Sequence, residues 1–206
     1  MTSRWRLEFR WARSSKCSPS FARLMASEAK SIALHGKLFQ PYLGADVIAV
    51  RVAEMGQKIA LDYAGTEPVM VVVLKGSAIF AADLSRAMRL PLEMEFVRLS
   101  SYSGTQSTGV VKALLPLADE LCFDRHLLVV EDIVDTGTTL SKFLPDLKAR
   151  GAASVKLAAL LSKPEARLHQ VVIDYLGFEI PNDFVVGYGL DYDELGRNIP
   201  GIWSAV

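Results

Sequence analysis

Short, uninterrupted apolar runs constrain the fold of this chain more than any other feature. The run from Val69 to Leu74 is rich in β-branched residues, and two similar runs extend from Leu127 to Val130 and from Ala158 to Leu161. Runs of this kind are typical of strands that are buried on both faces of a parallel sheet. Each is far shorter than the roughly 20 residues needed to span a bilayer. The sequence therefore predicts an α/β fold, and we expect no association with a membrane.

Helical patterns separate these runs. Apolar residues at helical spacing predict a helix that Asp46 caps and that continues to Tyr63, before Gly65 stops it. Two more helices are expected at residues 78–88 and 138–150, and further strands at residues 92–99, 110–115, 154–161, 171–175 and 184–188. The polar stretch 100–109 is expected to be a long loop between two strands. Alternation of strands and helices predicts a mainly parallel, twisted sheet with helices on both faces.

The cysteines and histidines indicate no metal site. Cys17 and Cys122 are the only cysteines, neither has metal-ligand spacing around it, and the three histidines are scattered. The chain is therefore expected to be a reduced, cytoplasmic protein without structural disulfides.

The charge is balanced overall but unevenly distributed. Residues 1–25 carry six basic side chains and one acid, so the remainder carries 17 basic and 22 acidic side chains, a net charge of −5. Such an acidic body argues against broad nucleic-acid binding. Residues 1–25 are expected to be a disordered extension; a transit peptide, or a start codon placed upstream of Met25, remains open. Residues 36–206 are expected to form the folded domain.

The segment from Leu127 to Leu140 is the strongest candidate for a ligand site. It leads from an apolar strand through a polar turn into a helix, and ligands of open α/β sheets bind at the carboxyl ends of strands. Gly137 permits close approach of the backbone, the helix offers unpaired N–H groups, and hydroxyl groups come from Thr136, Thr138 and Thr139. Together these groups predict a cradle for a phosphate.

Three acids accompany this cradle. Glu131 and Asp132 would repel a phosphate unless something offsets their charge, and either ribose hydroxyls or a Mg²⁺ ion would do so. Asp135 lies within the turn, from which it can reach a reacting atom. The segment has neither the glycine–lysine arrangement of a Walker loop nor a dinucleotide fingerprint.

The same segment closely resembles the phosphoribosyl-pyrophosphate-binding motif of type I phosphoribosyltransferases. The similarity extends from near Leu38 to Trp203, and other motifs resemble the hypoxanthine/guanine branch of that family. The resemblance implies the type I phosphoribosyltransferase fold, in which N- and C-terminal segments form a small hood. It also implies that the ribose and 5′-phosphate bind to the segment Glu131–Thr139, and that Asp135 accepts or stabilises the proton of purine N7.

Four further motifs carry implied roles. Leu74–Ser77 resembles the family loop in which Lys75 and Gly76 bind pyrophosphate and in which a cis peptide bond often precedes the lysine. Ser101 and Tyr102 resemble the start of a lid over the reaction centre. Arg197 resembles the arginine that grips pyrophosphate, and Asp191 resembles the acid that holds Mg²⁺ together with Glu131 and Asp132.

The implied purine site contains three residues. Lys163 resembles the lysine that donates to the 6-oxygen of the base, Phe184 the ring that stacks on it, and Val185 the residue whose backbone meets its edge. An ammonium group prefers a 6-oxo acceptor to a 6-amino group, so hypoxanthine and guanine are expected rather than adenine.

The resemblance therefore implies Mg²⁺-dependent purine salvage in the cytoplasm, with transfer from 5-phosphoribosyl-1-pyrophosphate to hypoxanthine or guanine by a homodimer or homotetramer. Two alternatives stay open. One is a transferase that prefers xanthine, and the other is a phosphoribosyltransferase-like regulator that binds nucleic acid.

Overall fold

The structure is a computed structural model that describes residues 31–100 and 112–206. Five parallel strands and one antiparallel strand form its main sheet. The apolar runs make its central strands: β3 (Val69–Val73), β6 (His126–Val134) and β7 (Ser154–Ser162). β4 (Glu93–Ser100) and β8 (Tyr175–Glu179) flank them, and β5 (Lys112–Leu115) pairs antiparallel with β4 at the edge. The strand order is β5-β4-β3-β6-β7-β8, which confirms the predicted, mainly parallel sheet.

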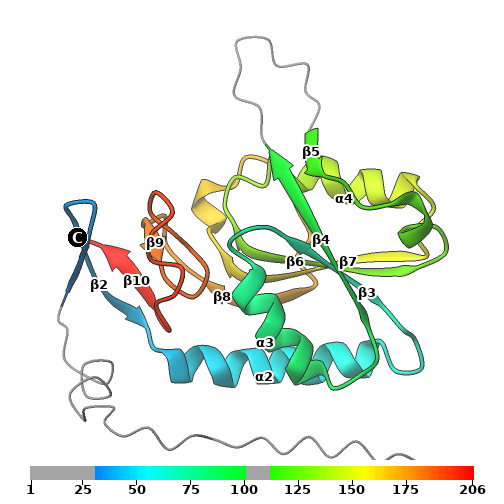
Figure 1. The fold of residues 1–206 in the computed structure, drawn as a ribbon, viewed down its shortest axis with the longest axis horizontal. Coiled ribbons are helices and arrows are strands. Elements are labelled where there is room, and N and C mark those ends of the chain that lie inside the picture. Colours follow the sequence, from blue (N-terminus) through cyan, green and yellow to red (C-terminus); the bar gives the residue numbers. More distant parts are fainter. Residues whose placement is uncertain (1–30, 101–111) are drawn as a thin grey trace, which may run out of the picture. The chain divides into compact units, whose positions relative to one another are not determined.

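Helices cover both faces of this sheet, as Figure 1 shows. α2 (Ala45–Asp62) and α3 (Ala78–Met88) pack on the face that buries Met70 and Val72, whereas α4 (Leu140–Ala149) packs on the face that buries Val69 and Val71. Successive residues of a strand point to opposite faces, so a continuous apolar run is needed when both faces are covered.

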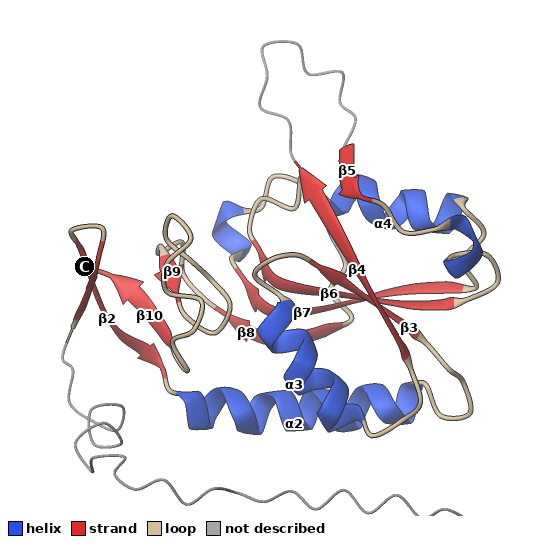
Figure 2. Ribbon diagram, viewed as in Figure 1, coloured by secondary structure: helices blue, strands red, loops and turns tan. Residues whose placement is uncertain are grey.

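A second, smaller sheet contains β1 (Ile32–Leu34), β2 (Lys37–Leu43), β9 (Val185–Val186) and β10 (Ile202–Ala205), in the order β1-β2-β10-β9 (Figure 2). We call this antiparallel sheet the hood. It is built from segments that lie near the two ends of the described chain, which confirms that part of the predicted fold. Tyr188, just after β9, donates a hydrogen bond to Asp83 of α3 (2.6 Å).

Several local predictions were inaccurate. The strand predicted at residues 171–175 is wrong, because β8 begins only at Tyr175. Val171 and Ile173 do pack into the α4-side core. Val172, however, is 79% exposed, and Asp174 exchanges hydrogen bonds with the backbone of Leu157 instead of joining the strand.

Other boundaries shifted. Gly44, not Asp46, caps α2, because the helix begins two residues earlier than predicted and Asp46 lies in its first turn. α4 begins at Leu140 rather than residue 138, and the strand predicted at 184–188 is shortened to β9 and lies in the hood. The first strand begins at Ile32, slightly before the predicted start of the folded domain at residue 36.

The order of the strands defines where a ligand can bind. From β3 the chain crosses through α3 to β4 on one side, and from β6 it crosses through α4 to β7 on the other side. Such a switch point opens a crevice between the carboxyl ends of the two strands. Residues Ser31–Val206 form one compact unit, and no helix in its described part is long and apolar enough to cross a membrane.

Candidate active site

The end of β6 extends beyond its neighbour β3. Pairing with β3 ends at Val130, whereas pairing with β7 continues to Val134. Glu131 and Asp132, which we call the acidic pair, are therefore part of the strand, which is longer than the predicted Leu127–Val130. One edge of the strand is unpaired at the acidic pair, and the loop after β3 lies beside it.

That loop, Leu74–Ser77, is called the pyrophosphate loop below. A cis peptide bond joins Leu74 to Lys75, as the resemblance implies. Gly76 packs directly against the acidic pair, since a Cβ at this position would lie 1.5 Å from Asp132 Oδ2. Glycine is needed here because any side chain would displace that carboxylate.

The acidic pair is partly buried at the end of the strand. Burial raises the pKa of both carboxyl groups, and the neighbouring charge of Asp132 raises the pKa of Glu131 further. The Ile133 N–H donates to Asp132 Oδ1 (2.8 Å), which fixes the carboxylate. Two partly buried carboxyl groups side by side at an open strand edge favour a cation or hydroxyl donors at this point.

A cavity of about 240 Å³ opens beside the acidic pair and is lined by Asp135–Thr139, which we call the phosphate loop. The side chain of Asp135 is exposed to it. Gly137 has a left-handed φ of 77°, and the Thr138 N–H and hydroxyl both lie within hydrogen-bonding distance of Thr136 Oγ1 (3.3 and 3.0 Å). The loop thus forms a closed turn of hydroxyl and backbone donors ahead of α4, as predicted for an anion cradle.

Arg167 supports the phosphate loop from outside, and the sequence analysis did not identify it. Its guanidinium donates to Ser162 Oγ (2.8 Å) and more weakly to the carbonyl oxygens of Asp135 (3.2 Å) and Val134 (3.4 Å). An arginine that follows β7 by a few residues carries no sequence signal for this role, because most of its partners are backbone oxygens of other segments.

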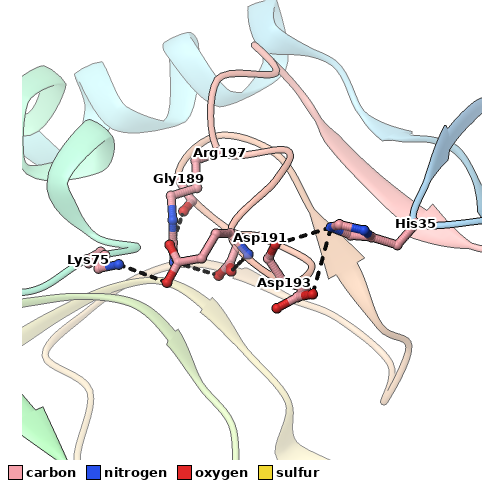
Figure 3. A network of polar contacts seen from close by, with 7 residues as sticks. His35, Lys75, Gly189, Asp191, Asp193 and Arg197 are labelled. Atoms are coloured by element: carbon pink, nitrogen blue, oxygen red, sulfur yellow. Dashed lines mark hydrogen bonds and ion pairs between the residues drawn. The ribbon is translucent and has the colours of Figure 1, made fainter.

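The hood contributes the loop Gly187–Arg197, called the hood loop. Gly189, with a φ of 104°, touches the pyrophosphate loop so closely that a Cβ would lie 2.0 Å from Gly76 O. Arg197 donates to Gly189 O (2.9 Å) and pairs with Asp191 Oδ1 (2.8 Å), as Figure 3 shows. Lys75, Gly76, Asp191 and Arg197 are therefore neighbours, although more than a hundred residues separate the two loops.

Glu194 joins the charges of this region and was not identified from the sequence. One of its carboxylate oxygens accepts a hydrogen bond from Lys75 Nζ (2.8 Å), and the other lies 3.4 Å from the Arg197 guanidinium. The hydrogen bond and charge of Lys75 lower the pKa of Glu194. Its own N–H donates to Asp191 Oδ2 (2.8 Å).

Lys163 begins the turn after β7, where its N–H donates to Val134 O (3.0 Å). Its side chain is only 7% exposed, whereas lysines are rarely buried unless paired. Among the residues that the structure describes, none accepts a hydrogen bond from its ammonium group. The described residues contain no buried side-chain nitrogen without a hydrogen-bond partner, so this ammonium nitrogen keeps access to solvent and can meet an external acceptor.

Phe184 lies just before β9, half-exposed, and its ring contacts are with the hood. Its ring packs edge-on against Tyr192 (centroids 5.5 Å apart), and Lys37 Nζ lies 4.9 Å from its centroid. Phe39 closes the same cluster at 6.2 Å. Val185 is buried in β9. Lys37 and Tyr192 were not predicted, because only the fold brings β2 next to the hood loop.

The predicted lid and the predicted Mg²⁺ site are not established by the described residues. Ser101 and Tyr102 lie outside the described residues. No group of three or more metal-ligating side chains occurs in the described ranges, so the acidic pair fits Mg²⁺ only if ligand oxygens complete the coordination. Both oxygens of Asp191 are already engaged, which fits an ion held through water.

Comparison with known proteins agrees with this geometry. Residues 44–193 match the model of the phosphoribosyl transferase domain family. The hypoxanthine-guanine phosphoribosyltransferase of Mycobacterium avium is 46% identical over 171 residues, covering 80% of this chain and 84% of that protein. That of Streptococcus pneumoniae is 46% identical over 158 residues, covering 76% and 87%.

A crystal structure of a hypoxanthine-guanine phosphoribosyltransferase from Bacillus anthracis superimposes with a TM-score of 0.75 at 37% identity, covering 81% of this chain and 98% of that one. The matched region contains the acidic pair, the phosphate loop and the pyrophosphate loop. A switch-point crevice, the loops that line it and this extent of identity lead to one conclusion: the chain belongs to the phosphoribosyl transferase family.

Proposed function

We propose that the protein performs purine salvage, transferring the 5-phosphoribosyl group from 5-phosphoribosyl-1-pyrophosphate to N9 of hypoxanthine or guanine. The observation that carries this proposal is the cavity of about 240 Å³ that is lined by the phosphate loop and by Glu131 of the acidic pair. One wall offers hydroxyl and N–H donors for a phosphate, and the other offers carboxylates for ribose hydroxyls. A phosphorylated ribose presents both kinds of group at once.

In this proposal the phosphate loop binds the 5′-phosphate through the backbone around Gly137 and the hydroxyl groups of Thr136, Thr138 and Thr139. Glu131 and Asp132 accept hydrogen bonds from the ribose hydroxyls. These charge-assisted bonds orient the sugar so that C1 faces the crevice.

Lys75, the backbone of Gly76 and Arg197 hold the pyrophosphate and neutralise the charge that grows on it as the bond to C1 breaks. Bound Mg²⁺ would supply further neutralisation, with Glu131, Asp132 and Asp191 as the residues that hold it. Departure of pyrophosphate leaves an oxocarbenium-like ribose, whose positive charge the acidic pair stabilises.

Asp135 acts on the incoming base. Its exposed carboxylate faces the cavity next to the ribose-binding acids, where it can accept the proton of purine N7 while N9 attacks C1. Lys163 donates to the 6-oxygen of the base, Phe184 stacks on its face, and the backbone of Val185 meets its edge. A 6-amino group cannot accept from an ammonium group, which selects against adenine.

The proposal includes a homodimeric or homotetrameric, cytoplasmic enzyme whose lid begins at Ser101 and Tyr102. The described free cysteine, Cys122, is buried, which is compatible with a reducing compartment.

Steady-state turnover with single bases tests the proposal. With 5-phosphoribosyl-1-pyrophosphate and Mg²⁺, hypoxanthine or guanine should give nucleoside monophosphate, adenine should not, and chelation of Mg²⁺ should abolish the rate. Turnover of xanthine alone would reassign the base. Absence of turnover together with salt-sensitive nucleic-acid binding would replace the enzyme with a regulator.

A further inference from the structure

We propose that Glu194 is an internal competitor for the pyrophosphate site and that it sets the affinity of the enzyme for pyrophosphate-bearing ligands. The proposal rests on the function proposed above, in which Lys75 and Arg197 hold pyrophosphate.

The contacts of Glu194 are those expected of an anion bound between these two cations. One carboxylate oxygen lies 2.8 Å from Lys75 Nζ, and the other lies 3.4 Å from the Arg197 guanidinium. The two cations come from different loops, so the carboxylate spans the junction between the pyrophosphate loop and the hood loop. A pyrophosphate oxygen that contacts both cations has to take the same position.

The backbone places Glu194 there. Asp193 and Glu194 both have left-handed φ values, of 47° and 67°, so the chain makes a tight turn between Asp191 and Arg197. The Glu194 N–H donates a hydrogen bond to Asp191 Oδ2 (2.8 Å), which anchors the turn independently of the Glu194 carboxylate. The side chain itself is 62% exposed and has room to swing into solvent when a ligand arrives.

In this proposal the Glu194 carboxylate replaces pyrophosphate on the two cations when the product leaves, which favours its release. Exposed ion pairs contribute little each, so Glu194 adds a modest penalty to ligand binding rather than blocking it. Its removal is therefore expected to tighten pyrophosphate binding by about two- to fivefold.

The test compares Glu194→Gln with Asp193→Asn, each measured for binding of Mg²⁺–pyrophosphate by calorimetry. Both variants remove one negative charge from the same turn. Asp193 is 81% exposed and faces His35 at 4.0 Å instead of the two cations. Competition predicts tighter pyrophosphate binding and a lower KM for 5-phosphoribosyl-1-pyrophosphate in Glu194→Gln alone, with the KM for the base unchanged.

Four outcomes overturn the proposal. Equal tightening in both variants would mean that only long-range charge matters. Weaker binding in Glu194→Gln would mean that the carboxylate holds the cations in place for the ligand. Lys75→Ala and Arg197→Ala serve as references: if they bind pyrophosphate normally, the site assigned to pyrophosphate is itself wrong. If they bind weakly while Glu194→Gln is unchanged, only the competition fails.

Discussion

The two anion sites proposed for this crevice are built in opposite ways. The phosphate loop is one contiguous segment, Asp135–Thr139, that folds on itself through backbone and hydroxyl contacts. The pyrophosphate site is assembled from two distant loops, and its charged side chains are already paired with acids of the hood loop. A contiguous cradle depends on local turn geometry, whereas an assembled site depends on the packing of the hood against the main sheet.

The largest effect is expected for Asp135→Asn, within the contiguous site. Amide substitution removes the proton acceptor but retains the shape, so kcat should fall by about 100-fold or more while pyrophosphate binding and the melting temperature persist. Asp46→Asn, which removes an exposed charge on α2, is the matched control. Near-normal turnover of Asp135→Asn would remove this residue from the mechanism.

Gly189→Ala tests the assembled site. A Cβ would lie 2.0 Å from Gly76 O, so the hood loop and the pyrophosphate loop must separate, and pyrophosphate affinity should fall by about tenfold or more. Affinity for a nucleoside 5′-monophosphate should change much less.

Gly65→Ala supplies the control for that change. Gly65 has a left-handed φ of 80° after α2, and no atom of the described residues lies within 4 Å of the position that a Cβ would take. Alanine at position 65 therefore has the conformational cost of a left-handed φ but no steric clash of its Cβ with a neighbouring atom. Equal loss of pyrophosphate affinity in both variants would show that contact between the two loops is unimportant.

Glu131→Gln is expected to stabilise the ligand-free protein. Burial raises the pKa of Glu131, so the folded state binds more protons than the unfolded state between the ordinary and the raised pKa. Stability of the parent protein is therefore lost as the pH rises through that window. The variant escapes this loss and should gain on the order of 1 kcal/mol at neutral pH, at the expense of activity.

Urea unfolding at about pH 4 and about pH 7 measures the effect, since the gain should shrink toward the ordinary carboxyl pKa. A variant that is less stable than the parent at neutral pH would indicate that Glu131 is satisfied by partners within the fold.

The smallest effect is expected for Arg167→Met. The phosphate loop keeps its internal hydrogen bonds when its outer support is lost, so affinity for a nucleoside 5′-monophosphate should fall only about threefold. Arg150→Met is the control, because Arg150 makes similar bonds to Leu117 O and Asp119 away from the cavity. A loss as large as that of Gly189→Ala would mean that the contiguous site is not self-supporting.

The sequence predicted the central strands and the phosphate loop because both are local patterns. An apolar run specifies a strand covered on both faces, and a strand, a threonine-rich turn and a helix in succession specify an anion cradle. The apolar residues at 171–175 predicted a strand wrongly, since an apolar pattern indicates which side chains are buried and not whether the backbone joins a sheet.

The other residues of the candidate site could not be predicted from the sequence, for a physical reason. Glu194, Arg167 and Lys37 act through partners on other elements, and single-sequence patterns contain no information on those contacts. Charged residues in loops are usually solvated, so nothing distinguished Glu194 from Asp193 before the fold placed it between two cations.

The contact between Gly189 and Gly76 has a thermodynamic consequence. One segment, Phe184–Arg197, carries both the proposed stacking ring for the base and the arginine for the leaving group, and it rests on the pyrophosphate loop through two glycines. Any ligand that prefers one position of this segment shifts the affinity of the other ligand by the same factor, because coupling between two binding equilibria is reciprocal. With the base and the pyrophosphate bound as proposed, this single backbone contact would couple their affinities.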